Sequence, residues 1–333
     1  MRWPNTTRPI PPKGKSPWWW KEQKLEPTIS PAGTEKEIEK PTAQKRFYLV
    51  PIDWALFGYL GFLSVSILLF HPRLPNWGWF LVFHGAIVGI VLLMAATLKE
   101  SATGLKGLLR WGYLILLFTF LYEETGYLVH LFTDRWFDAQ LIDFEYKLTG
   151  VIPSVWMAER ANIWLTEIFM AGYFSYYFII PLGALILWAN RKTEDFQQLV
   201  LSVALGFFIS YALFLLYPVE GPRYHIPHLH PPPVESPLFY HLVKFVIDKG
   251  AIHGGCMPSS HVAVAVLVLM CLYRGAKTWF WILLPLVLGL AVGTVYGRFH
   301  YVSDVLVGLA IPPAAFGLAR RWLTSFYSRA NVS

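Results

Sequence analysis

Two histidines and an aspartate are the residues best suited to chemistry. His300 and Asp304 are four positions apart, so on a helix the carboxylate would face the imidazole and hold one ring nitrogen protonated. The other nitrogen could then attack an electrophile. His261 supplies a second imidazole, which could protonate a leaving oxygen. These three residues predict a catalytic pair of histidines supported by a carboxylate.

Groups that bind an anion accompany the histidines. A serine after a proline is expected to begin a helix, whose free backbone N–H groups attract phosphate. A neighbouring glycine allows close backbone approach, and arginine guanidinium groups fit phosphate oxygens. We therefore expect phosphate to be bound by Arg223, Ser259, Ser260, Arg298 and Gly255. Because no acidic cluster accompanies them, the pattern predicts phosphoryl transfer without a metal or other cofactor.

The elements that position these residues are expected to be membrane helices. Of the 333 residues, 55% are hydrophobic and only 15% are charged, whereas globular proteins carry about a quarter charged residues. The mean hydropathy is +0.43, and the aromatic fraction of 17% suits membrane interfaces. This composition excludes a soluble enzyme, a disordered chain and a disulfide scaffold. It predicts an all-α, polytopic helical membrane bundle.

Polarity divides the chain into four predicted segments. They are a disordered cytoplasmic tail (1–47), N-terminal transmembrane helices (48–133), an interfacial amphipathic segment (134–161) and a transmembrane catalytic core (162–323). About eight apolar stretches can span a hydrocarbon core of about 30 Å. They lie near 53–71, 77–98, 110–132, 162–189, 196–218, 257–273, 278–297 and 300–319.

The basic residues predict the orientation of these helices. Most of the 28 Lys and Arg residues lie on inner segments if both termini are cytoplasmic, as the positive-inside rule requires. This topology brings loops that begin at Pro218, Gly254 and Gly297 to the same outer face. The net charge of +7 therefore reflects topology and does not indicate a nucleic-acid partner. A plasma or inner membrane is the expected location.

Other polar residues are weaker candidates. Ionisable groups inside membrane spans are often functional. Glu123 and Glu124 are therefore interpreted either as head-group contacts or as partners in a structural pair with an arginine or tyrosine, and Glu167 follows the same logic. Glu220 and Tyr224, in the first outer loop, are further candidate head-group contacts.

Histidines and cysteines outside the motifs are assigned no chemistry. His225, His228 and His230 could bind zinc in principle, but prolines separate them and no cysteine or carboxylate lies between them. Loop polarity is the favoured interpretation. Cys256 and Cys271 are expected to be small apolar residues of one helix, too far apart for a disulfide.

The motifs resemble those of the type 2 phosphatidic acid phosphatase superfamily. Residues 258–261, Pro-Ser-Ser-His, are similar to its Pro-Ser-Gly-His motif, and residues 300–308 are similar to the end of its third motif. The resemblance covers roughly half of the chain. It implies that His300 forms a phosphohistidine, that Asp304 orients it and that His261 protonates the leaving group.

The first and third motifs also show differences from the superfamily. The resemblance implies that Arg223 and Ser259 bind phosphate. The lysine expected seven residues before Arg223 falls on Leu216, and the third-motif arginine falls on Thr294, with Arg298 as its candidate replacement. This lysine-poor pattern is similar to the inositol phosphorylceramide synthase branch, which transfers a head group between lipids.

The sequence leaves three functions open. The first is an integral membrane, metal-independent lipid phosphate phosphatase that works through a phosphohistidine. The second is an inositolphosphotransferase-like enzyme that moves a phospho-head group onto a lipid alcohol. The third is a catalytically silent transporter or scaffold, against which the intact His300, Asp304 and His261 argue. Either enzyme would act on a lipid phosphate substrate.

Overall fold

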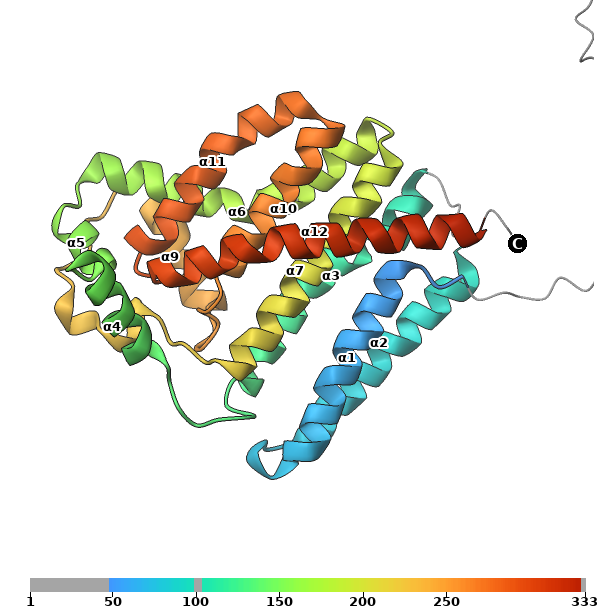
Figure 1. Ribbon diagram of the computed structural model, residues 1–333, viewed down its shortest axis with the longest axis horizontal. Coiled ribbons are helices and arrows are strands. Elements are labelled where there is room, and N and C mark those ends of the chain that lie inside the picture. The colour runs from blue at the N-terminus through green and yellow to red at the C-terminus, as the bar shows by residue number, and fades with distance from the viewer. Residues whose placement is uncertain (1–47, 99–103, 331–333) are drawn as a thin grey trace, which may run out of the picture. The chain divides into compact units, whose positions relative to one another are not determined.

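The structure is a computed structural model that describes residues 48–98 and 104–330 (Figure 1). These residues belong to one compact unit. The predicted tail, 1–47, lies outside the described residues, as do 99–103 and 331–333. The described part of the chain folds into helices, without a β-strand. The predicted all-α class is therefore confirmed.

Seven helices among the described residues are long and apolar enough to cross a membrane. They are α1 (Pro51–Phe70), α2 (Trp77–Thr97), α3 (Gly104–Leu128), α6 (Ile163–Ala189), α7 (Thr193–Leu216), α11 (Lys277–Tyr296) and α12 (Val302–Ala330). An eighth apolar helix, α10 (Ser260–Gly275), has 16 residues and is about 24 Å long. The expected bundle of about eight helices therefore consists of seven long helices and one that is too short to span alone.

Short helices lie between the long ones. They are α4 (Asp138–Thr149), α5 (Pro153–Glu159), α8 (Pro222–His225) and α9 (Phe239–Gly250), with the 3-10 turns η1 (His71–Arg73) and η2 (Pro227–Leu229). The helices α4 and α5 form the pair that the alternating pattern of residues 134–161 predicts.

The helix α10 lies within a group formed by α6, α7, α11 and α12 (Figure 1). Most of its side chains are buried. Glycines let α6 and α11 approach closely, because a Cβ atom at Gly172 or Gly293 would overlap the backbone of the opposite helix. The tight group fixes the position of α10, whose first turn carries His261.

The helices α1 and α2 run side by side (Figure 1) and are joined to α3 by buried polar contacts. Arg110 of α3 forms an ion pair with Asp53 of α1. His84 of α2 lies 2.6 Å from the carboxylate of Glu124 in α3 and 2.8 Å from the hydroxyl of Ser64 in α1. These contacts hold the first three helices together at positions where lipid offers no hydrogen bonds.

Candidate active site

The three polar loops meet in space. The first and second loops form a parallel backbone bridge between Val219 and Gly255. The backbone N–H of Arg223 in the first loop donates a 2.9 Å hydrogen bond to the carbonyl of Arg298 in the third. Backbone contacts therefore bring the candidate side chains of distant segments into one place.

The turn that carries His300 is defined by its backbone. Arg298 adopts a left-handed conformation with φ of 66°, which ends α11 and reverses the chain. The N–H groups of Phe299 and His300 then donate to the carbonyl of Thr294, at 2.9 and 3.1 Å. Thr294, on which the expected third-motif arginine falls in the sequence, contributes a backbone carbonyl to this turn.

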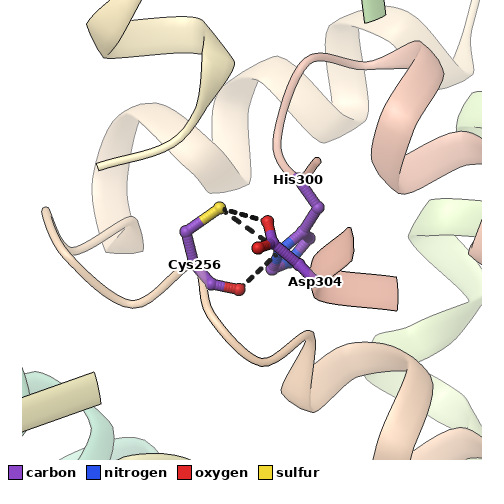
Figure 2. A group of neighbouring side chains, drawn as sticks. All are labelled: Cys256, His300 and Asp304. Carbon is purple, nitrogen blue, oxygen red and sulfur yellow. Dashed lines mark hydrogen bonds and ion pairs between the residues drawn. The ribbon is translucent and has the colours of Figure 1, made fainter. Parts of the chain in front are cut away.

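His300 is held by Cys256 (Figure 2). Its Nδ1 lies 2.8 Å from the carbonyl oxygen of Cys256, so Nδ1 carries a proton and donates it to that oxygen. The carboxylate of Asp304 lies 3.5 Å from the same nitrogen, which is too long for a strong charged hydrogen bond. The Cys256 carbonyl therefore fixes the tautomer and leaves Nε2 without a proton, so that Nε2 has a lone pair that can react.

Asp304 is connected to His300 partly through Cys256. Its Oδ2 accepts a hydrogen bond of 2.9 Å from the Cys256 thiol and one of 2.7 Å from the N–H of Tyr301. Its Oδ1 is buried without a hydrogen-bond partner among the described residues. Two interpretations of Cys256 need correction, because the residue lies before α10 rather than on it and its thiol is a hydrogen-bond donor. Cys271, in contrast, packs in the apolar core.

Burial sets the charge of these groups. It lowers the pKa of His300 to about 4, and the hydrogen bond to the Cys256 carbonyl opposes that shift. Burial, followed by the negative charge of Asp304, raises the pKa of the Cys256 thiol well above its usual value. At neutral pH the imidazole is therefore uncharged and the thiol keeps its proton.

His261 faces the reactive nitrogen. Its Nδ1 lies 3.4 Å from Nε2 of His300, and its Nε2 lies 3.3 Å from the hydroxyl of Tyr173. The rings of Tyr173 and Tyr176 pack against the imidazole, with centroids 5.3 and 4.3 Å away. The second histidine is thus fixed where it can exchange a proton with a group bound at His300.

The expected phosphate-binding residues do not all lie in one pocket. Arg223 and Gly255 line one pocket together with both histidines. Ser259 is buried as the N-cap of α10, and Ser260 lines a neighbouring cavity. The guanidinium of Arg298 donates to the carbonyl of Pro231 at 2.8 Å. Arg298 lines another cavity and not the pocket of His300, so its side chain does not lie with Arg223 and the two histidines.

The four candidate head-group contacts also lie at different places in the structure. Glu220 and Tyr224 line the pocket of His300, whereas Glu123 lines the neighbouring cavity. Glu124 is paired with His84, so its partner is a histidine and not the expected arginine or tyrosine. Only the first two can touch a ligand at His300.

Glu167 caps a helix. Its carboxylate accepts hydrogen bonds from the hydroxyl of Ser236 and from the N–H of Phe239 at the start of α9. These contacts satisfy a backbone donor that the helix leaves free. A structural role therefore explains this residue.

A metal-type donor set occurs at the site itself. Among the described residues, one group of side chains has possible metal-ligand atoms close together. It consists of Cys256, His300 and Asp304, whose ligand atoms all lie within 4.8 Å of one another. Thiolate, imidazole and carboxylate are zinc ligands in proteins. Here the same atoms form hydrogen bonds with one another or with backbone, and the thiol holds its proton, so the arrangement fits a hydrogen-bonded network. The three loop histidines do not form such a group.

The sequence interpretation missed two acidic residues of α4. Asp138 accepts hydrogen bonds from the N–H groups of Glu220 and Gly221, at 2.9 and 2.8 Å. Glu145 accepts from both the N–H and the hydroxyl of Ser303, at 2.7 Å, and burial raises its pKa. The two carboxylates fix the first and third loops. Their spacing of two helical turns was the signal in the sequence that could have found them.

Comparison with known proteins supports the interpretation of the motifs. The chain is 24% identical over 197 residues to a PA-phosphatase related-family protein of Dictyostelium discoideum. The match covers 53% of this chain and 35% of the relative, so the chain spans about a third of that relative's length. No solved structure matches the chain. A family model described as the PAP2 superfamily matches residues 139–318, which is more than half of the chain. The matched range includes Arg223, His261, His300 and Asp304. The chain therefore belongs to the PAP2 superfamily.

Proposed function

We propose that this protein is a membrane-embedded, metal-independent phosphatase that transfers the phosphoryl group of a lipid phosphate to His300. One observation carries this proposal. An uncharged imidazole presents Nε2 to a pocket that also holds His261 and Arg223. Membership of the PAP2 superfamily supports a lipid phosphatase or phosphotransferase.

In the first step, Nε2 of His300 attacks phosphorus, and the bond from phosphorus to the lipid oxygen breaks. His261, protonated on Nδ1, gives its proton to that oxygen. Arg223 stabilises the negative charge on the phosphoryl oxygens. The Cys256 carbonyl keeps the Nδ1 proton, and the Asp304 carboxylate stabilises the positive charge that the ring acquires.

In the second step, the neutral His261 takes a proton from water, and the resulting oxygen attacks phosphorus. The phosphorus–nitrogen bond breaks, so inorganic phosphate leaves and His300 returns to its neutral form. Each proton that His261 gives in the first step is recovered in the second, and neither step requires a metal.

An apolar cavity beside the pocket supports a lipid substrate. Side chains of α3, α6, α7 and α9 line it, including aromatic rings such as Tyr176 and Tyr211. Tyr122, Tyr173 and His261 line both this cavity and the pocket of His300. An acyl chain could therefore lie in apolar surroundings while its phosphate reaches the histidines.

We also infer the orientation of the protein in its membrane. The distribution of Lys and Arg supports cytoplasmic termini. The pocket would then open on the opposite face of a plasma or inner membrane, where it meets lipids of the outer leaflet.

The test is a search for the covalent intermediate. Purified protein is mixed, with EDTA present, with phosphatidic acid carrying a radiolabelled phosphate, and acid-labile, alkali-stable label on the protein is counted. We expect label and released phosphate in the wild type, and neither in His300→Gln. The matched control is His228→Gln, because His228 is an exposed histidine of the first loop. Activity that EDTA abolishes, or label that persists without His300, would refute the mechanism.

A further inference from the structure

One wall of the pocket of His300 is acidic. Glu220 lines it together with Arg223 and both histidines, and no other carboxylate of the described residues lines this pocket. A carboxylate repels the phosphate that an arginine attracts. Glu220 can therefore favour binding only if the ligand also brings hydrogen-bond donors.

The backbone of Glu220 is fixed, because its N–H donates to Asp138 at 2.9 Å. Its two carboxylate oxygens lie 3.4 Å from Nδ1 of His225 and 3.4 Å from Nδ1 of His253. These distances exceed the 2.7–2.9 Å of a strong charged hydrogen bond. A carboxylate offers about four acceptor positions, so Glu220 has capacity for a further donor.

The side chains around Glu220 pack against one another and form the rim of the pocket. The ring of Tyr224 stacks on His253 with centroids 3.9 Å apart, and the guanidinium of Arg223 lies 5.1 Å from the Tyr224 ring. The Glu220 side chain is 20% exposed, whereas that of His253 is 56% exposed. The carboxylate is thus held at the inner side of the rim, where a ligand on His300 would pass.

Among the other acids of the surrounding helices, Glu123 lines only the neighbouring cavity, and two more are already paired. Glu124 is paired with His84 inside the bundle. Asp248 is paired with Lys244 at 2.6 Å and lies 3.4 Å from Arg223. Glu220 is therefore the carboxylate that can meet a substrate at the reactive nitrogen.

We propose that Glu220 binds a hydroxyl or ammonium group close to the substrate phosphorus, so that the pocket prefers phospholipids with such a donor over phosphatidic acid. The inference rests on the proposed function in that the phosphorus must reach His300. Arg223 binds the negatively charged phosphate, and the Glu220 carboxylate accepts a hydrogen bond from the donor group of the lipid. The donor can belong to the lipid backbone, as in lysophosphatidic acid, or to a head group on phosphorus, as in phosphatidylglycerol and phosphatidylethanolamine.

The test measures binding without turnover. Dissociation constants are determined for His300→Gln and for the double variant His300→Gln, Glu220→Gln, in detergent micelles. The ligands are short-chain phosphatidic acid, lysophosphatidic acid, phosphatidylglycerol and phosphatidylethanolamine. We expect Glu220→Gln to weaken the donor-bearing lipids about ten-fold relative to phosphatidic acid. Whether lysophosphatidic acid or the head-group lipids show the loss identifies the source of the donor.

Glu235→Gln is the matched control, because Glu235 is exposed on the same long loop and does not line the pocket. An equal change for all four lipids would refute a role of Glu220 in recognition. The two proposals can also fail separately. A selective loss of binding without a phosphohistidine in the wild type would refute only the catalytic mechanism. A phosphohistidine without a selective loss would refute only the role of Glu220.

Discussion

Two regions of this protein bury ionisable side chains, and they differ in whether a reactive lone pair faces an open pocket. Between α1 and α3, the two oxygens of Asp53 accept hydrogen bonds from Arg110, from the hydroxyl of Tyr113 and from the N–H of Val50. Between α10 and α12, His300 is bonded on Nδ1, but its Nε2 faces only His261, at 3.4 Å, and an open pocket.

The comparison shows that burial and charge alone do not identify a reactive site. Both regions pair an acid with a base in surroundings of low dielectric constant. In the first region the acceptors of the carboxylate are saturated, so the energy of the contacts holds helices together. In the second region a lone pair is left for a ligand. We therefore expect substitutions in the first region to change stability, and those in the second to change activity.

The largest expected effect is that of His300→Gln on turnover. Removing a nucleophile lowers the turnover number by at least about 10⁴-fold, while the glutamine amide can still donate to the Cys256 carbonyl. Stability should stay close to that of the wild type. Phosphate release and the midpoint of thermal unfolding are measured on the same preparation. A loss of activity that merely follows a loss of folded protein would remove the contrast between the two regions.

Arg110→Met should give the opposite result. Removing one partner of a buried ion pair leaves an uncompensated charge and costs about 3–5 kcal/mol of unfolding free energy. Arg110 does not line the pocket of His300, so turnover by the folded fraction should be retained. Unfolding by sodium dodecyl sulfate, followed by tryptophan fluorescence, measures the change.

The double variant Asp53→Leu, Arg110→Met serves as the control for this prediction. Replacing both partners by apolar residues removes the unpaired charge, so most of the lost stability should return. If the double variant were as unstable as Arg110→Met, the ion pair would not be the cause of the loss.

Much of the fold could be predicted because the membrane imposes a simple pattern. A helix in lipid needs a long apolar stretch, and such stretches predicted the positions of α1, α2, α6, α7 and α11. The motif spacing likewise predicted that His300 lies near Asp304, and the two side chains are 3.5 Å apart. The expected helix begins two residues later than predicted, however, because α12 starts at Val302 and His300 lies in the turn before it. These features depend on local sequence, and no knowledge of distant contacts is needed.

The rest of the site depends on contacts between distant segments. Asp138 binds N–H groups more than 80 positions away, and no local pattern encodes that pairing. Cys256 acts through a carbonyl that the loop directs at His300. The left-handed backbone of Arg298 is coupled to a side chain that bonds Pro231, so its charge, expected at the phosphate, is directed elsewhere. Side-chain direction in loops is set by tertiary structure.

Substitutions of Cys256 should have a smaller effect on turnover, and they separate the role of its thiol from that of its backbone carbonyl. Cys256→Ala removes the thiol that donates to Asp304 but keeps the carbonyl that holds His300, so we expect turnover to fall about ten-fold. Cys256→Ser restores a donor and should recover most of the activity. Single-turnover rates of phosphohistidine formation measure the effect. Equal rates in the alanine variant and the wild type would show that the carbonyl alone positions the imidazole.

The smallest expected effect is that of mild acid on the first step. His300 must be uncharged to attack, and burial lowers its pKa to about 4. A lowered pKa keeps the imidazole neutral to lower pH, so the rate of phosphohistidine formation should not fall between pH 7 and pH 5. For an imidazole with the ordinary pKa of about 6.5, the neutral fraction would fall about 25-fold over that range. Acid also favours the protonated His261 that this step needs, so a loss on the acid side reports His300. The titration of the substrate phosphate is measured separately by phosphorus NMR. A midpoint near pH 6.5 would mean that water surrounds the imidazole, and the pocket would then differ from the α1–α3 region in its solvation as well as in its free lone pair.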